Sequence, residues 1–269
     1  MKCSFCKNDN FKIAFKYTSP IKGEVKINLK GKPYRRHYLL CNFCGHFLSK
    51  YEFSLKNLYS EEYMENTYGE RISKTFNKII NLPKRKSDNV QRIKRIEKFV
   101  KKKVDKKKIN LLDIGSGLGV FPYSVKKIGW KCCALDPDKR AVKHINKNLG
   151  IKALHKDFLK VKKIEKNNFD VITLNKVLEH VEKPIIMLKK ANKFLNNNGL
   201  IYIEVPDGTE AAKIGKTREE FGVDHIHVFS MRSLSLMIKN AGFNILKIER
   251  IREPSTKYTL FAFISKIHF

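Results

Sequence analysis

The sequence lacks any long apolar run. No stretch of 18 or more consecutive apolar residues occurs among its 269 residues, so no membrane-spanning helix is expected. The first residues, Met1 to Cys6, contain no apolar core of the kind that a secretory signal requires. These two absences favour a cytoplasmic protein. A length of 269 residues accommodates one full α/β domain and a small extra one.

Acidic residues and arginines are also scarce. The chain has 26 acidic residues against 56 basic ones, a formal net charge of +30, but only 11 of the basic residues are Arg. Arg is the residue that makes bidentate contacts with phosphates and bases, so the charge is a weak argument for a nucleic-acid partner. The Lys runs at 101–103 and 106–108 adjoin an amphipathic helical pattern over residues 90–104. A solvated helix face explains them, and an anionic partner is the alternative.

The chain does contain a short apolar strand followed by three glycines. The strand is expected at residues 110–114, and its near-continuous apolar character is typical of a buried parallel strand. Gly115, Gly117 and Gly119 follow at alternate positions, where glycine permits a tight turn and a close approach of the backbone to a ligand. A helical pattern begins at Val120. Strand, turn and helix together predict a nucleotide-binding corner.

Four further strands are expected in the same part of the chain, at residues 131–136, 152–154, 169–174 and 199–206. The first of these ends in Asp136, about twenty residues past the first glycine, where a carboxylate can accept both hydroxyls of a ribose. The next leads into Asp157 and Phe158, and the third is followed by Asn175. Because parallel strands end at the same edge of a sheet, these residues are expected near the glycine turn.

Two of these segments carry a resemblance to a known family. The pattern D-x-G-x-G-x-G at 113–119 resembles motif I of the class I S-adenosylmethionine (SAM) methyltransferases, and L-E-H-x-x-x-P at 178–184 resembles a segment of those that methylate small molecules. The resemblance covers roughly residues 90–265 and implies a Rossmann-like α/β domain with a seven-stranded sheet. It implies that the last two strands, near 244–252 and 258–266, form an antiparallel hairpin at the sheet edge. The SAM-binding residues implied by it are Asp113, Gly115, Gly117, Gly119, Asp136, Asp157, Phe158 and Asn175.

Four of the six cysteines form two C-x-x-C pairs, Cys3 with Cys6 and Cys41 with Cys44, separated by 34 residues. Two such knuckles can place four thiolates around one Zn²⁺. A segment of about 50 residues buries too little apolar surface to fold well without a bound metal or another cross-link. We therefore predict a zinc ribbon over residues 1–50, with strands at 11–17, 25–29 and 38–40. Disulfide or redox pairing is the alternative, which a cytosolic location disfavours.

Two smaller features complete the domain prediction. Residues 51–89 are expected to form a helical connector, whose tyrosines between 59 and 68 either pack against the protein or act as a lid over the SAM pocket. Residues 90–269 are expected to form the methyltransferase domain. Cys132 and Cys133 lie in a predicted strand and are expected to be core residues.

The late segment Asp224-His225-Ile226-His227-Val228-Phe229-Ser230 extends the resemblance. Together with the ribbon and the connector, it resembles bacterial methyltransferases of sugars, surface polysaccharides and secondary metabolites, including the sugar C-methyltransferases. That group usually has Glu where this chain has Asp224, and its sugar C-methyltransferases carry a Tyr just before the segment, where this chain has Phe221 and Gly222. The Glu-to-Asp departure is conservative and shortens the carboxylate arm, whereas the unmatched Tyr counts against carbon methylation and favours an oxygen or nitrogen acceptor.

Methyl transfer from SAM is an in-line displacement that requires alignment of donor and acceptor. A hydroxyl acceptor must also lose a proton, and His suits that task because its unperturbed pKa lies near neutrality. The candidate catalytic residues are His180, His225 and His227, with Asp224 as an orienting group, and the resemblance favours His225 as the base. Alternation along an extended segment predicts His225 and His227 on one face and Asp224 on the other.

The predicted function is methylation of a small molecule, a sugar or nucleotide-sugar foremost. An RNA methyltransferase with an RNA-binding ribbon is one alternative. Against it, no cysteine follows Cys133 to serve in pyrimidine carbon-5 methylation, and Asn175-Lys176-Val177-Leu178 stands where base-amine methyltransferases have Asn/Asp-Pro-Pro-aromatic. A non-catalytic SAM-binding module is the other alternative, which an intact set of SAM-binding residues does not exclude.

Overall fold

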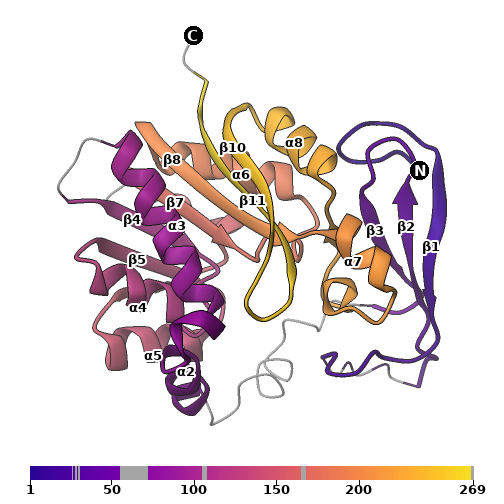
Figure 1. The fold of residues 1–269 in the computed structure, drawn as a ribbon, viewed down its shortest axis with the longest axis horizontal. Coiled ribbons are helices and arrows are strands. Elements are labelled where there is room, and N and C mark those ends of the chain that lie inside the picture. The colour runs from indigo at the N-terminus through magenta and orange to yellow at the C-terminus, as the bar shows by residue number, and fades with distance from the viewer. Residues whose placement is uncertain are drawn as a thin grey trace.

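The computed structural model of the chain describes residues 1–25, 27, 29, 31–54, 72–104, 108–164 and 168–267. In this part of the chain the strands form one sheet of seven and one of four (Figure 1). The predicted tyrosine segment between residues 59 and 68 lies outside the described residues.

The larger sheet has the order β10-β11-β8-β7-β4-β5-β6. Its strands are β4 (Asn110–Ile114), β5 (Lys131–Asp136), β6 (Lys152–His155), β7 (Phe169–Asn175), β8 (Leu195–Pro206), β10 (Phe243–Arg252) and β11 (Tyr258–Lys266). Strand β4 pairs in parallel with β5 and β7, and β11 pairs antiparallel with both β8 and β10. The predicted seven-stranded sheet and its terminal hairpin are therefore confirmed, with β11 inserted between β8 and β10.

Helices cover both faces of this sheet. The described helices are α2 (Ile72–Ile80), α3 (Asp88–Lys103), α4 (Val120–Lys127), α5 (Lys139–Leu149), α6 (Pro184–Ala191), α7 (Gly208–Ile214) and α8 (Met231–Asn240), with short 3₁₀ turns η2 (Lys84–Lys86), η3 (Phe158–Lys160), η4 (Asn192–Phe194) and η5 (Glu219–Phe221). The apolar sides of α6 and α8 pack on one face, and those of α3, α4 and α5 on the other. Both faces of the central strands are thereby buried, which explains their near-continuous apolar sequences. None of the described helices combines the length and the apolar character that crossing a membrane requires.

The predicted Lys-rich helix is α3. Ile93, Ile96 and Val100 are buried on its inner side, while the Lys residues at 101–103 are exposed at its end. This agrees with a solvated face, and the second Lys run falls partly outside the described residues.

The smaller sheet has the order β1-β2-β3-β9, and its last strand comes from the far end of the chain. Strands β1 (Phe11–Tyr17), β2 (Arg36–Cys41) and β3 (Phe47–Tyr51) belong to the N-terminal segment, whereas β9 (His227–Val228) follows β8. The prediction of a strand over 25–29 is wrong for its described residues, because Ile27 and Leu29 pack on an apolar cluster without strand pairing. Strand β3, which was not predicted, pairs with β2 instead.

The N-terminal segment packs directly against α8 and the residues just before it. Phe5 stacks on Phe229 with ring centroids 5.7 Å apart, and its carbonyl oxygen accepts from Asn240 at 2.7 Å. Ser230, the N-cap of α8, donates from its hydroxyl to the carbonyl oxygen of Cys44. In Figure 1 the small sheet lies beside α7 and α8, at one side of the molecule.

Candidate functional site

The glycine turn joins β4 to α4 at the carboxyl end of the sheet. All three glycines have positive φ angles, +73° at Gly115, +48° at Gly117 and +76° at Gly119. A Cβ atom on Gly115 would lie 2.6 Å from Val177, and one on Gly119 would lie 2.6 Å from Ile145, whereas one on Gly117 would meet nothing within 4 Å. Gly115 and Gly119 are therefore required by packing, and Gly117 faces open space.

Backbone N–H groups hold the carboxylate of Asp136 against this turn. One carboxylate oxygen accepts from the N–H of Gly117 at 2.7 Å, and the other accepts from the N–H of Asp138 at 2.8 Å. Burial raises the pKa of Asp136, and these two hydrogen bonds oppose that effect. The carboxylate is thus fixed at the end of β5, where the sequence predicted a ribose-binding acid.

A hollow of about 660 Å³ opens between this carboxylate and the loop after β7. Five of the predicted SAM-binding residues line it: Gly115, Gly117, Asp136, Asp157 and Phe158. Lys176, His180 and Met187 line it as well. We refer to it as the donor hollow. It brings the ends of β4, β5, β6 and β7 together around one cavity, the place where open α/β sheets bind ligands.

Asp113 and Asn175 lie on the other side of the turn, in a second hollow of about 410 Å³ that they share with Gly115 and Arg92. Asp113 accepts from the Thr173 hydroxyl at 2.6 Å and from the Asn175 amide at 3.0 Å. Burial raises the pKa of Asp113 to about 6, against these hydrogen bonds. Gly119 lines neither hollow, and its role is in packing against α5.

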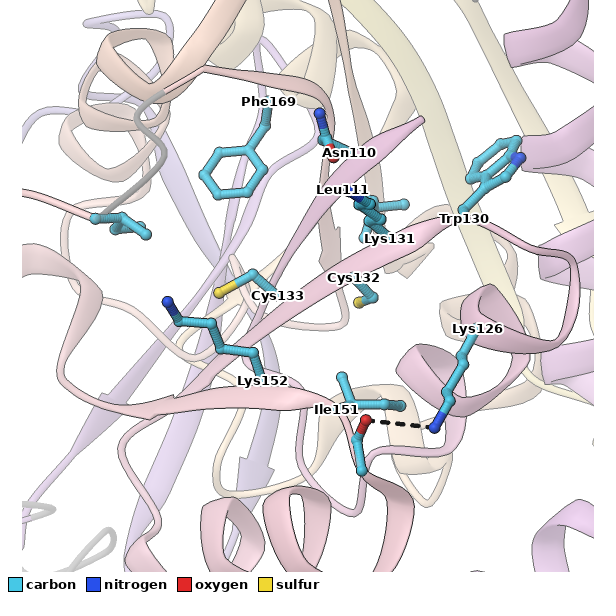
Figure 2. Close-up of a pocket in the computed structure, with 12 residues that line it drawn as sticks. Asn110, Leu111, Lys126, Trp130, Lys131, Cys132, Cys133, Ile151, Lys152 and Phe169 are labelled. Atoms are coloured by element: carbon cyan, nitrogen blue, oxygen red, sulfur yellow. Dashed lines mark hydrogen bonds between the residues drawn. The ribbon is translucent and has the colours of Figure 1, made fainter. Parts of the chain in front are cut away.

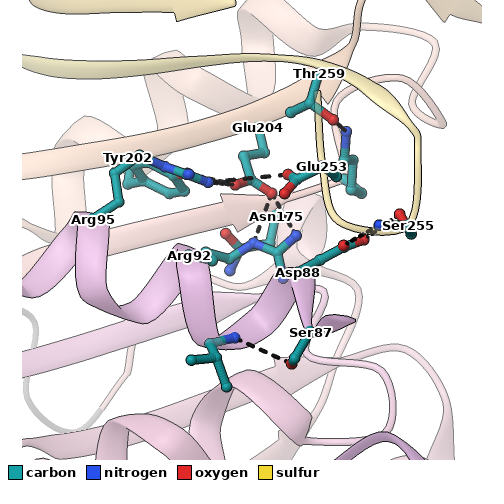
Figure 3. Close-up of polar contacts among 12 residues, drawn as sticks. Ser87, Asp88, Arg92, Arg95, Asn175, Tyr202, Glu204, Glu253, Ser255 and Thr259 are labelled. Atoms are coloured by element: carbon teal, nitrogen blue, oxygen red, sulfur yellow. Dashed lines mark hydrogen bonds and ion pairs between the residues drawn. The ribbon is translucent and has the colours of Figure 1, made fainter. Parts of the chain in front are cut away.

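An ionic network closes this end of the sheet (Figure 3). Glu204 is fully buried and pairs with Arg92 at 2.6 Å and with Arg95 at 2.5 Å. Burial favours the protonated form of Glu204, but the cations around it outweigh that effect and lower its pKa. Glu253 lies beside the pair with neither carboxylate oxygen hydrogen-bonded, and burial, together with Glu204, raises its pKa to about 7.

The tip of the β10–β11 hairpin is hydrogen-bonded to α3 near this network. The N–H and the hydroxyl of Ser255 both donate to the carboxylate of Asp88, at 2.9 and 2.6 Å (Figure 3). Ser255 and Asp88 both line the second hollow, so this hydrogen-bonded pair forms part of its wall.

A third hollow, of about 290 Å³, adjoins the donor hollow at Lys176, which lines both. Its walls carry many charged groups, among them Glu179, Asp224, His225 and Lys257. Residues 21–25 of the N-terminal segment complete it. We refer to it as the acceptor hollow.

The predicted bases His180 and His225 meet at the junction of these hollows. His180 lines the donor hollow, His225 lines the acceptor hollow, and their ring centroids are 4.9 Å apart. Asp224 lies beside them, with a carboxylate oxygen 3.7 Å from Nδ1 of His180. The structure thus brings three of the four predicted catalytic residues together.

His227 lies elsewhere, and the expected alternation is wrong. The N–H of His225 bonds to the carbonyl oxygen of Gly222, so this segment turns before β9 begins at His227. The His227 ring is buried against the N-terminal segment, with Nδ1 3.0 Å from Nε2 of His46. Burial lowers the pKa of His227 to about 4, so its ring is neutral at pH 7.

Three residues near the acceptor hollow were not singled out from the sequence: Lys176, Glu179 and Tyr38. Burial lowers the pKa of Lys176, and its Nζ donates to the Thr259 hydroxyl at 2.5 Å. Its place directly after β7, at the edge where ligands bind, was the signal available. Tyr38 had no such signal, because its partners lie about 190 residues further along the chain.

The four predicted metal ligands also come together. The Sγ atoms of Cys3 and Cys44 are 3.7 Å apart, those of Cys6 and Cys41 are 3.5 Å apart, and all four lie within 4.8 Å of one another. Four thiolates at about 2.3 Å from a tetrahedral Zn²⁺ are about 3.8 Å from each other. The donor set therefore fits Zn²⁺ in number, chemistry and spacing.

Another hollow, of about 540 Å³, lies at the opposite edge of the sheet, between the amino ends of β4, β5 and β6 (Figure 2). Cys132 and Cys133 line it, and Lys126 closes one side by donating to the carbonyl oxygen of Leu149 at 2.8 Å. Cys133 is buried, in agreement with its predicted core position. None of the predicted SAM-binding or catalytic residues lines this hollow.

The part of the chain that forms most of the larger sheet matches known proteins. A family model described as a methyltransferase domain matches residues 81–248. The ubiquinone biosynthesis O-methyltransferase of Pelagibacter ubique (strain HTCC1062) is 32% identical over 104 residues, which are 36% of this chain and 42% of that protein. The match therefore spans less than half the length of this curated relative.

Solved structures show the same fold at low sequence identity. Magnesium protoporphyrin IX methyltransferase from Synechocystis PCC 6803, with bound SAH, superposes with a TM-score of 0.57 at 12% identity over 77% of this chain and all of that chain. The 1,6-didemethyltoxoflavin-N1-methyltransferase of Burkholderia thailandensis gives a TM-score of 0.57 at 14% identity over 83% of this chain and 96% of that chain.

Proposed function

The chain belongs to the methyltransferase domain family, and we propose that it is a SAM-dependent methyltransferase that acts on a small polar acceptor. In this proposal SAM occupies the donor hollow, with its ribose hydroxyls on Asp136 and its adenine between Asp157 and Phe158. The open space at Gly117 supports this placement, because a ligand can approach the backbone closely there.

The proposal depends on one observation: Lys176 lines both the donor hollow and the acceptor hollow. The donor hollow and the acceptor hollow meet at this residue, so a methyl group presented from one is exposed to a nucleophile held in the other. Methyl transfer needs such an alignment, and a large share of its barrier is overcome by positioning alone.

The walls of the acceptor hollow indicate the kind of acceptor. Carboxylates, lysines and a histidine line it. Such a surface favours a ligand that offers many hydrogen-bonding groups, because an apolar ligand would leave these groups desolvated and unpaired. A sugar or nucleotide-sugar fits this description, and we propose a hydroxyl oxygen as the methyl acceptor.

We propose His225 as the proton acceptor for that hydroxyl. Its Nδ1 lies 2.8 Å from the carbonyl oxygen of Glu220, a partner that can only accept, so Nδ1 carries the hydrogen and Nε2 carries the lone pair. His180, whose Nδ1 lies 2.9 Å from the carbonyl oxygen of Asp224, has the same tautomer and is proposed to orient the substrate.

We further propose that Cys3, Cys6, Cys41 and Cys44 hold one structural Zn²⁺. Four thiolates leave no open coordination position, so this ion would stabilise the N-terminal segment and take no part in the reaction. That segment in turn forms part of the acceptor hollow through residues 21–25.

The test is transfer of a labelled methyl group from SAM, with nucleotide-sugars and total RNA offered in parallel. The proposal expects label in a nucleotide-sugar or another hydroxyl-bearing small molecule and none in RNA. Label in RNA alone would overturn it in favour of an RNA methyltransferase, the alternative that the net charge of +30 favours.

A further inference from the structure

Glu179, His180 and His225 form a cluster outside the cysteine site. One carboxylate oxygen and one ring nitrogen from each histidine all lie within 4.8 Å of one another. The first two residues belong to the loop after β7, and the third belongs to the loop before β9, so the cluster joins segments about 45 residues apart in the sequence. It lies at the junction of the donor and acceptor hollows.

Glu179 is the unusual member of this cluster. It is fully buried, and neither of its carboxylate oxygens has a hydrogen-bond partner. A buried carboxylate without a partner is costly, and native structures pair such groups or use them to coordinate metals. Its main chain is held firmly, because its carbonyl oxygen accepts from the N–H groups of Ile226 and His227 at 2.8 and 3.0 Å.

Neighbouring cations do not replace the missing partner. The Lys176 ammonium is close enough to interact electrostatically with Glu179, but its Nζ donates to the Thr259 hydroxyl. Lys257, on the wall of the same hollow, pairs with Glu219 at 3.3 Å. The carboxylate of Asp224 adds a second negative charge beside His180.

The two histidines have the tautomer that a metal ligand needs. Each ring has its Nδ1 within 2.9 Å of a backbone carbonyl oxygen, that of Asp224 for His180 and that of Glu220 for His225. A carbonyl can only accept, so the hydrogen is on Nδ1 and the lone pair is on Nε2. Histidines that bind metals in proteins are oriented in this way, by donating their other N–H to a carbonyl or carboxylate.

We propose that Glu179, His180 and His225 bind one divalent transition-metal cation of the Mn²⁺, Fe²⁺ or Zn²⁺ class. Two imidazoles and one carboxylate suit such ions better than Mg²⁺ or Ca²⁺, which prefer all-oxygen sites. Ligand atoms around one such ion lie about 3–4 Å apart, so small side-chain movements close the cluster on it. Three protein ligands leave positions open for oxygen atoms of another molecule.

The role of the cation rests on the proposed function. Positioned at the acceptor hollow, it would bind a hydroxyl oxygen of the acceptor and lower the pKa of that hydroxyl, whose proton would pass to the carboxylate of Asp224 on the wall of the same hollow. His225 would then act as a ligand of the ion in place of acting as the base.

The test is a titration of the full chain with MnCl₂, in which unbound Mn²⁺ is followed by its EPR signal. The chain is first loaded with a single equivalent of Zn²⁺, which fills the four-thiolate cysteine site and leaves the cluster of Glu179, His180 and His225 vacant. Manganese is chosen because it prefers nitrogen and oxygen ligands over the thiolates of the cysteine site. We expect one bound Mn²⁺ per chain, and at least tenfold weaker binding in Glu179→Gln, His180→Ala and His225→Ala. Glu219→Gln removes the same charge from the same hollow without touching the cluster and is expected to bind Mn²⁺ like the wild type.

Absence of Mn²⁺ binding by the wild-type chain would overturn the proposal. Equal weakening by Glu219→Gln would also overturn it, because the attraction would then be unspecific. SAM binding by each variant, measured by calorimetry, reports whether it is folded. The titration uses neither SAM nor an acceptor, so a wild type that transfers methyl groups but binds no Mn²⁺ refutes the cation site alone.

Discussion

The hydroxyl of Tyr38 lies 2.7 Å from the carbonyl oxygen of His225. Tyr38 belongs to β2 of the N-terminal sheet and is fully buried, and its hydroxyl is also 2.9 Å from the carbonyl oxygen of Gly222. Tyr51 reaches the same loop, donating to the carbonyl oxygen of Val223 at 2.8 Å. The small sheet thus fixes the backbone of the loop that carries the proposed catalytic histidine.

We expect Tyr38→Phe to lower turnover while leaving SAM affinity unchanged. The substitution keeps the ring packed and removes a buried hydrogen bond to the loop, a loss of roughly 1–2 kcal/mol, which corresponds to about a five- to thirtyfold effect if it is felt at the reacting centre. Tyr17→Phe is the matched control, because the Tyr17 hydroxyl also reaches across to the larger domain but bonds to the carbonyl oxygen of Lys216. Steady-state kinetics that show equal turnover in both variants would contradict this role of Tyr38.

Much of the larger domain could be predicted from the sequence because its signals are local. Buried parallel strands have continuous apolar sequences, and the expected range of residues 131–136 coincides with β5. The glycine turn was equally readable, because three positive φ angles at alternate positions call for glycine. The acids at the strand ends then follow from the shared edge of the sheet.

The arrangement of the acceptor hollow could not be predicted, because it depends on contacts between distant segments. Strand β9 has only two residues and exists because it pairs with β3, so no periodicity marks it. The turn before it directs His225 and His227 to different surroundings, which a single extended segment would not do. The Glu179 side chain is likewise buried by packing that its own sequence neighbours do not reveal.

Gly117→Val is expected to weaken SAM binding by more than tenfold, measured by calorimetry. The added side chain would enter open space at the turn, where the proposed cofactor approaches the backbone. Any side chain is also strained at φ +48°, so backbone strain must be separated from blocking. Gly242→Val supplies this control, because Gly242 has φ +83° and open space but lies between α8 and β10. Both variants should lose stability, and SAM affinity should fall in Gly117→Val alone.

Loss of a cysteine ligand should disorder the N-terminal sheet and leave the larger domain folded. Cys41→Ser is expected to abolish bound zinc and to disorder the small sheet, because a structural metal supplies much of the folding free energy of such a segment. Turnover should be lost with the Tyr38 contact, whereas SAM should still bind to the donor hollow. Cys132→Ser, outside the cluster, should keep its zinc. Metal analysis of the freshly purified wild type that finds no zinc would contradict the assignment.

Glu253→Gln should stabilise the protein at alkaline pH. Burial and the charge of Glu204 raise the folded-state pKa of Glu253 to about 7, above its unfolded value, so the ionised side chain destabilises the fold. This penalty is absent below the unfolded pKa, grows as the pH rises toward 7 and is complete above it. From about 1.4 kcal/mol per pKa unit it is of the order of 3–4 kcal/mol.

Thermal unfolding at several pH values measures this effect. The stability gain of Glu253→Gln over the wild type should increase between pH 5 and pH 8. Glu249→Gln is the control, because Glu249 lies on β10, which ends directly before Glu253, but pairs with Lys247 at 3.0 Å and is half exposed. A gain that is independent of pH would show that charge is not its cause.

His225→Ala is expected to lower turnover by about 10²–10⁴-fold, the usual contribution of a general base, and to leave SAM affinity nearly unchanged. His180→Ala should have a smaller effect, because His180 lines the donor hollow and is proposed to orient the substrate. His37→Ala, on β2 and outside the three hollows, should be fully active. Full turnover of His225→Ala across pH 6–9 would exclude it as the base and make His180 the next candidate. If both variants were fully active, the acceptor would be an amine that needs no base. The Mn²⁺ titration separately decides whether His225 acts as a base, with a proton on Nε2, or as a metal ligand, with a cation bound to Nε2.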